Sequence, residues 1–154
     1  MVSAMIEQVG DDIKTAITGD SEFNTASGWN IIHSAKDEDE DMDFEYDVPN
    51  IIYGAESVPT EYFMDGSRIM SSDFTFVMNL SEFTTDSSNL TRKRLVNYKL
   101  DKLQNILNDM TFSSVTPIQF NTGGGEMTAA VPIGEDDFLY RGSMTMSVEW
   151  LDET

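Results

Sequence analysis

Two segments of the chain alternate between apolar and polar side chains, and this alternation constrains the fold more than any other feature. In residues 138–150, apart from Leu139, one parity is apolar and the other is polar or charged. The apolar members are Phe138, Tyr140, Met144, Met146, Val148 and Trp150. Residues 69–80 alternate likewise, with Phe74, Phe76, Met78 and Leu80 on one side. A period of two is typical of a β-strand with one buried face and one wet face. The sequence therefore predicts two long, half-buried strands.

Two other segments carry apolar residues at the spacing of an amphipathic helix. Residues 2–17 place Val2, Ile6, Val9, Ile13 and Ile17 on one stripe, and residues 90–110 do the same with Val96, Leu100, Leu103, Leu107 and Met110. Spacings of three and four residues are those of a helix with one apolar face. Gly10 lowers the helix propensity of the first segment slightly, and Gly19 with Asp20 ends it.

Shorter strands are expected around these elements, at residues 29–32, 42–48, 51–53, 62–64, 115–120 and 127–133. Asp65-Gly66 is a strong turn signal and predicts a hairpin into the strand over 69–80. Residues 121–125 are expected to form a flexible hairpin tip between the strands over 115–120 and 127–133. The order is helix, three or four strands, helix, two or three strands. It predicts one α+β domain over residues 1–154, with a mostly antiparallel sheet and both helices packed on one face.

Composition excludes several classes of function. The chain has 154 residues, no cysteine and a single histidine, which removes thiolate chemistry and every site that needs two histidines. No apolar run approaches the length that crosses a bilayer, and the first residues lack the pattern of a secretory signal, so no membrane association is expected. The net charge of -19 opposes DNA binding. Adaptation to high salt and a role in repelling DNA both explain that charge.

The strongest concentration of acid lies in residues 36–53, KDEDEDMDFEYDVPNIIY. Residues 37–41 are interpreted as a solvated loop, and residues 42–48 as a strand whose outer face is all carboxylate. The run lacks the glycine that a calcium-binding loop requires, so no metal site is predicted. The acidic residues are Asp37, Glu38, Asp39, Glu40, Asp41, Asp43, Glu45 and Asp47.

No candidate for catalysis stands out. Gly123, Gly124 and Gly125 lack the lysine and the hydroxyl residue of a phosphate-binding loop, and no helix is expected after them. These glycines remain a candidate contact loop for a partner. His33 follows Ile32 in a polar setting and is expected on the surface or in a turn. Neither an enzyme nor a cofactor is predicted.

The second helical segment carries five of the nine basic residues, which are Arg92, Lys93, Arg94, Lys99 and Lys102. One interpretation is a solvated helix face. The other is an interface, because one cationic face on an otherwise anionic molecule favours head-to-tail contact between copies. Such heterologous contacts close into rings when the rotation between copies permits.

The order of elements resembles that of the tail terminator, or tail completion, proteins of long-tailed phages and related viruses, often described as minor capsid proteins. The resemblance is carried by a first amphipathic helix over residues 1–17, a strand and hairpin, the helix TRKRLVNYKLDKLQNIL over residues 91–107, and the last strand DDFLYRGSMTMSVEW over residues 136–150. It covers most of the chain as a pattern, without a diagnostic motif. The acidic, insertion-like segment around residues 20–48 departs from it.

The resemblance implies a structural virion protein. Six copies would form a ring at the tail–neck junction, assembled in the host cytoplasm, that caps the tail tube and ends its polymerisation. Its partners would be the tail-tube protein and a neck or head-completion protein, and DNA would pass through the lumen without specific binding. The acidic residues of segment 37–47 would then be candidates for the lumen lining, and the five basic residues for the contact between subunits.

Three alternatives from other classes remain open at this point. A tail-tube or neck-connector protein would polymerise into tubes or bind the portal. An acidic DNA-mimic inhibitor would bind a basic partner with a steep dependence on salt. A halophilic enzyme would show a defined pocket and depend on molar salt.

Overall fold

The computed structural model describes residues 5–24, 28–33, 49–54, 57–62, 65–81, 92–113, 115, 117–123, 126–132 and 138–152. The acidic run over 37–47, with its expected strand over 42–48, lies outside these residues, as do Gly124 and Gly125.

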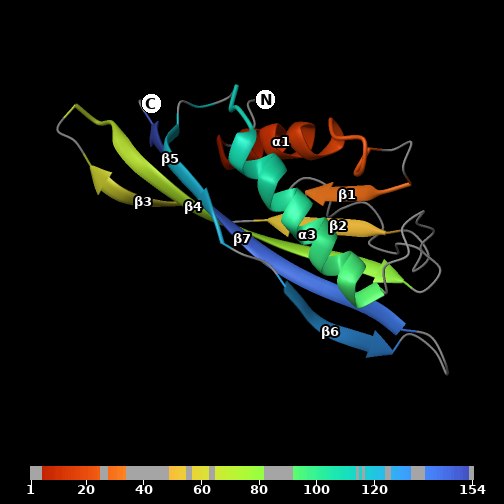
Figure 1. Cartoon of the computed structure of the whole chain (residues 1–154). Coiled ribbons are helices and arrows are strands. Elements are labelled where there is room, and N and C mark those ends of the chain that lie inside the picture. Colours follow the sequence, from red (N-terminus) through yellow and green to blue (C-terminus); the bar gives the residue numbers. More distant parts are fainter. Residues whose placement is uncertain are drawn as a thin grey trace.

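The elements follow the order expected from the sequence, with four strands between the helices and three after them (Figure 1). They are α1 (Met5–Thr18), β1 (Asn30–His33), β2 (Asn50–Gly54), β3 (Ser57–Tyr62), β4 (Arg68–Ser81), α3 (Arg92–Asp109), β5 (Pro117–Thr122), β6 (Glu126–Pro132) and β7 (Phe138–Asp152). The α+β class with a mostly antiparallel sheet is therefore confirmed.

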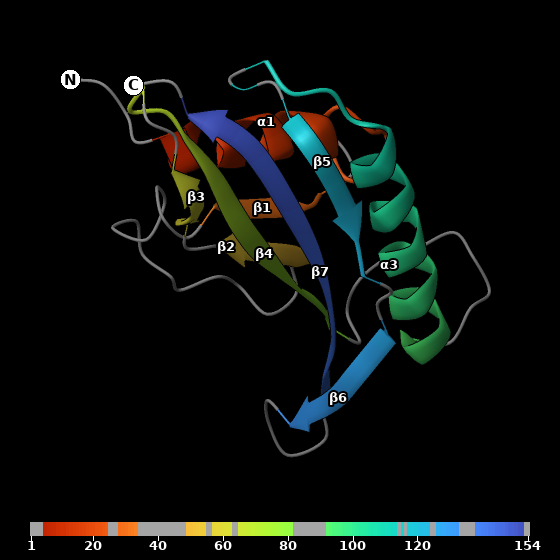
Figure 2. The same ribbon diagram turned by 90° about the vertical axis from the view of Figure 1, so that its left-hand side faces the viewer.

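The two segments with the clearest alternation, β4 and β7, form the centre of the sheet. They pair antiparallel from Arg68 opposite Asp152 to Ser81 opposite Leu139. Strands β2 and β3 pair with successive parts of β4, and β5 and β6 pair with successive parts of β7. Strand β1 extends the sheet beyond β2 in the one parallel pairing among the described strands. Figure 2 shows β5 and β6 one after the other along β7.

The hairpin predicted at Asp65-Gly66 is confirmed, because β3 and β4 pair antiparallel around it. Gly66 has a φ of 92°, which a residue with a side chain rarely adopts. The Asp65 carboxylate oxygen Oδ1 accepts hydrogen bonds from Ser67 N at 3.0 Å and Ser67 Oγ at 2.6 Å. This side-chain-to-backbone contact holds the turn.

The second hairpin expected from the sequence, with its tip at residues 121–125, is wrong. Strands β5 and β6 do not pair with each other. Both pair with β7, with Thr122 opposite Met146 and Glu126 opposite Ser143. Gly123 stays close to β7: its N–H donates to Thr145 O at 2.8 Å, and an added Cβ would lie 2.6 Å from Thr145 Oγ1. The 15 residues of β7 offer an edge long enough for two short strands in succession.

The core contains the apolar parity of both central strands. It comprises Phe74, Phe76, Met78 and Leu80 of β4, Met144, Met146, Val148 and Trp150 of β7, Val9, Ile13 and Ile17 of α1, and Leu100, Leu103 and Leu107 of α3. Each such buried side chain stabilises the fold by about 1.5–3 kcal/mol relative to its exposed state. Helix α3 packs against β4, β5, β6 and β7, and α1 packs against β1 and α3. The placement of both helices on a single face stays a prediction.

Candidate functional site

The five basic residues of the second helix do not form one exposed cationic face. Lys99 is buried: its ammonium lies 3.4 Å from Glu22 Oε1 and within 6 Å of the ring centres of Phe23 and Trp29, at 5.6 Å and 5.9 Å. An ammonium over aromatic faces is attracted by their electrons, and the carboxylate supplies the opposite charge. Lys99 is therefore unavailable for contact between subunits.

Lys102, about one helical turn after Lys99 on α3, binds the same turn at Asp20 and Glu22. Its Nζ lies 3.8 Å from Asp20 Oδ2 and 3.7 Å from Glu22 Oε2, and its side chain is 39% exposed. Lys99 and Lys102 thus fasten the turn after α1 to the side of α3. The sequence predicts that the two lysines lie on one side of the helix. It does not predict that the turn with Asp20 and Glu22 lies opposite them.

The remaining basic residues lie in the first turn of α3. Arg94 is exposed there, and the backbones of Arg92 and Lys93 precede it. The first turn of α3 contains no acidic residue, and its last turn contains no basic residue. Asp109 is the last residue of the helix and is exposed. The partial charges of a helix are positive at its N-terminus and negative at its C-terminus, so α3 carries the less favourable sign of charge at each end.

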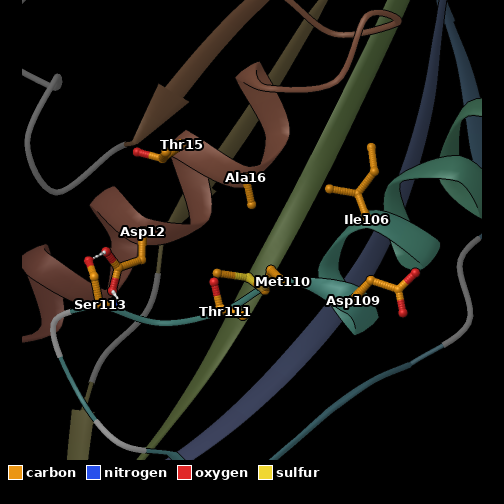
Figure 3. Close-up of a pocket in the computed structure, with 8 residues that line it drawn as sticks. All are labelled: Asp12, Thr15, Ala16, Ile106, Asp109, Met110, Thr111 and Ser113. Atoms are coloured by element: carbon orange, nitrogen blue, oxygen red, sulfur yellow. Dashed lines mark hydrogen bonds between the residues drawn. The ribbon is translucent and has the colours of Figure 1, made fainter.

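A cleft of about 460 Å³ opens where the C-terminal end of α3 lies beside α1, and we call it the α1–α3 cleft. It is lined by Asp12, Thr15 and Ala16 of α1, Ile106 and Asp109 of α3, and Met110, Thr111 and Ser113 of the segment that follows (Figure 3). Its volume is within the range of sites that hold small ligands or protruding side chains.

The cleft has a carboxylate on each side. Ala16 and Met110 lie between Asp12, on the side of α1, and Asp109, on the side of α3, and Ile106 lies on the same side as Asp109 (Figure 3). Ser113 orients Asp12, donating from its N–H to Oδ2 at 3.1 Å and from its Oγ to Oδ1 at 2.8 Å. Such a site suits a cation with an apolar stem, which describes the side chains of arginine and lysine.

Sequence reasoning missed this cleft. Helical spacing places Asp12 beside Ala16, and Asp109 beside Ile106, on the flanks of the two apolar stripes. Nothing local indicates that these two flanks face each other, because that depends on how α1 and α3 pack.

The polar parity of β4 and β7 forms a second surface, which we call the outer face. It comprises Ser71, Asp73, Thr75, Val77 and Asn79 of β4 with Arg141, Ser143, Thr145, Ser147 and Glu149 of β7. Asp73, Thr75 and Thr145 are exposed on it, and Asp73 Oδ1 accepts a hydrogen bond from Ser147 Oγ at 2.6 Å. The alternation in the sequence predicted this wet face directly.

One end of the outer face is occupied by a buried polar ladder across three strands. Asn79 Nδ2 donates to Asn50 Oδ1 at 2.8 Å, and Arg141 Nε donates to Asn79 Oδ1 at 2.9 Å. Both asparagines are almost fully buried. The guanidinium of Arg141 is thereby engaged within the sheet.

The expectation that His33 lies on the surface or in a turn is wrong. His33 is the last residue of β1 and is buried, with its imidazole stacked on the ring of Tyr53. An added Cβ on Gly10 would collide with this imidazole. The glycine that lowered the helix propensity of α1 is therefore what allows the helix to pass over His33.

Two further features of the described residues bear on function. No group of three or more His, Cys, Asp or Glu side chains is placed there to hold a metal ion. The helices in that part of the chain are too short or too polar to cross a membrane. The acidic candidates for a lumen lining lie outside it.

In comparisons with known proteins, no family model matches the chain and no curated protein matches it.

Proposed function

We propose that this chain is a structural protein of a viral tail whose copies form a ring of six. The ring caps the tail tube, ends its polymerisation and joins it to the neck of the capsid. Its location is the tail–neck junction of the virion, and its partners are the tail-tube protein and a neck or head-completion protein. The order and type of the elements, and the pattern of helix and last strand described above, support this proposal.

The observation that carries the proposal is the outer face of β4 and β7. From Ser71 opposite Glu149 to Asn79 opposite Arg141, these strands place large apolar side chains toward the core and, apart from Val77, polar or charged side chains on the other side. These nine residues of strand extend roughly 30 Å at about 3.4 Å per residue. A surface of this length and polarity suits the wall of an aqueous channel.

The charge of the outer face fits a channel that DNA crosses. Asp73 and Glu149 contribute carboxylates, and the sequences of β4 and β7 contain no lysine. Arg141 is the one cation of this parity, and it is bound to Asn79. A wall that presents hydroxyls and negative charge does not hold the DNA phosphates. The net charge of -19 has the same sign.

Light scattering at low and molar salt, combined with negative-stain electron microscopy, tests the proposal. Mutual repulsion between copies of charge -19 is screened in molar salt, so we expect a particle of six subunits with a central opening there. Long tubes would assign the chain to the tail-tube class instead. A monomer at every salt concentration that also fails to join the tail-tube protein of its virus would overturn the proposal. Tight, salt-sensitive binding of that monomer to basic proteins would favour the DNA-mimic alternative.

A further inference from the structure

The α1–α3 cleft combines negative charge with apolar surface. Asp12 lies on one side of it and Asp109 on the other, with Ala16 and Met110 between them (Figure 3). Ser113 fixes the position of the Asp12 carboxylate through two hydrogen bonds, from its Oγ at 2.8 Å and from its N–H at 3.1 Å. A group that complements the cleft therefore has a positive charge at one end and apolar surface along the rest.

The end of α3 adds to the negative charge at the cleft. The last turn of this helix contains no basic residue, and the last carbonyl groups of a helix carry a partial negative charge. Met110 and Thr111 follow the helix directly, and both line the cleft. The cleft thus lies at the end of the helix dipole that favours a cation.

The basic side chains that the structure describes are engaged within their own copy, so they are a poor source of this cation. Lys99, Lys102 and Arg141 have the partners given above. The others with described side chains also interact within the chain, and they are Lys14, Arg68 and Arg94. Two copies with a net charge of -19 also repel each other. These observations favour a different protein as the partner.

We infer that the α1–α3 cleft binds a lysine or arginine side chain of a different protein. The methylene stem of that side chain lies on Ala16 and Met110, and its charged head reaches Asp12 or Asp109. The inference goes beyond the proposed ring, because all the residues of the site belong to one copy. On the proposed ring, the cleft becomes a contact for one of its two protein partners.

Methyl NMR of the full chain tests the site, with the peptide acetyl-Ala-Arg-Ala-Lys-Ala-amide as the probe. We expect the methyl signals of Ala16, Ile106 and Met110 to shift with one dissociation constant. Nuclear Overhauser contacts should join these methyl groups to the methylenes of the peptide. The variant Asp12→Asn/Asp109→Asn should bind at least about fivefold more weakly, because it removes both carboxylates that the charged head can reach.

The variant Asp73→Asn/Asp101→Asn is the matched control. It removes the same number of charges from exposed positions of β4 and α3 that do not line the cleft. At about 0.15 M salt, where the screening length is about 8 Å, we expect it to change the affinity less than about twofold. Asp109→Asn alone keeps the hydrogen bonds between Asp12 and Ser113, and it should also weaken binding. That variant separates the loss of charge from a displacement of Ser113.

Several outcomes would overturn the inference. Equal weakening by the two double variants would leave only a general attraction of the acidic chain for cations. Shifts without contacts from the peptide methylenes would contradict the position of the stem. Methyl shifts that appear when the chain is concentrated without peptide would make a second copy the partner. Tighter binding of putrescine, which carries the same charge as the peptide, would make the ligand a free polyamine.

The same samples separate this inference from the proposed function, because light scattering measures assembly independently. A ring that forms from a chain whose cleft does not bind the peptide removes only the inference. A chain that binds the peptide in the cleft and never assembles, alone or on its tube, removes only the proposed ring.

Discussion

The imidazole of His33 stacks on the ring of Tyr53, with centroids 5.0 Å apart and ring planes inclined by 3°. The Tyr53 hydroxyl in turn donates to the backbone oxygen of Gly10 at 2.6 Å. His33 Nδ1 also lies 3.8 Å from Asp11 Oδ1 on the same helix. These contacts join α1 to β1 and β2, and they require the absence of a side chain at Gly10.

Replacing Gly10 with alanine is therefore expected to destabilise the fold even though alanine is the better helix former. The new Cβ collides with the His33 imidazole, and overpacking of this kind costs about 1–3 kcal/mol. Urea unfolding at fixed salt measures the change in the free energy of unfolding. In a chain that already carries His33→Ala, adding Gly10→Ala should lower the free energy of unfolding much less than it does in the unmodified chain. An equal loss in both backgrounds would show that the imidazole is not the obstacle.

Lys99 and Lys102 are expected to contribute unequally to stability. Lys99→Met keeps an apolar stem but leaves the partly buried Glu22 carboxylate without its close ammonium, and a cost of about 1–3 kcal/mol follows. Lys102→Met should cost less than about 1 kcal/mol, because that ammonium is more exposed and its pairs are longer. Unfolding in urea gives both values. Combining Lys99→Met with Glu22→Gln should cost less than the sum of the two single changes, and strict additivity would contradict the pairing.

The stability of the turn at Asp65 is expected to depend on pH. The hydrogen bonds from the side chain and then the backbone of Ser67 hold the pKa of the Asp65 carboxyl below its ordinary value. A depressed folded-state pKa stabilises the turn above the ordinary pKa, and this contribution is lost as the pH falls through the folded-state value. In Ser67→Ala the pKa of Asp65 should rise toward its ordinary value. NMR titration of the carboxyl carbon measures this pKa. Ser67→Thr keeps the hydroxyl and should leave the pKa of Asp65 lowered. A pKa of Asp65 in Ser67→Ala that equals that of the unmodified chain would refute the role of the hydroxyl.

If the outer face lines a channel for DNA, cations placed on it should hold DNA. The variant Thr75→Lys/Thr145→Lys adds two lysines at exposed, directly opposed positions of β4 and β7. Assembled rings of this variant should retain single- or double-stranded DNA in a filter-binding assay at low salt, with retention lost as salt rises. Asn97→Lys/Asn105→Lys adds the same charge at exposed sites of α3 and serves as the control. Equal retention by both variants would mean that the outer face is not the wall of the channel.

The arrangement of the basic residues and of the α1–α3 cleft was readable from the sequence only in part. The adjacent basic residues at 92–94 and the helix that carries them follow from composition and apolar spacing alone. The division of the basic residues into a bound pair, Lys99 and Lys102, and a separate first turn required the position of the turn at Asp20 and Glu22. The cleft required the packing of α1 beside the end of α3.

The sequence by itself determined the order of the described elements and, in β4, β7, α1 and α3, the side that is buried. Alternation in β4 and β7 and the helical stripes of α1 and α3 are local properties, because each reflects which side chains along one segment avoid water. The turn at Asp65-Gly66 is local in the same sense, since it needs only a backbone that adopts a positive φ.

Only the tertiary structure decided which edges and flanks meet. Residues 121–125 look like a hairpin tip, yet β5 and β6 continue along β7 because its long edge satisfies the backbone hydrogen bonds of both. His33 precedes a polar segment of the sequence, yet it is buried because Gly10 lets α1 pass close over it. Contacts between distant segments depend on how all the buried faces fit together at once, and no single stretch of sequence contains that information.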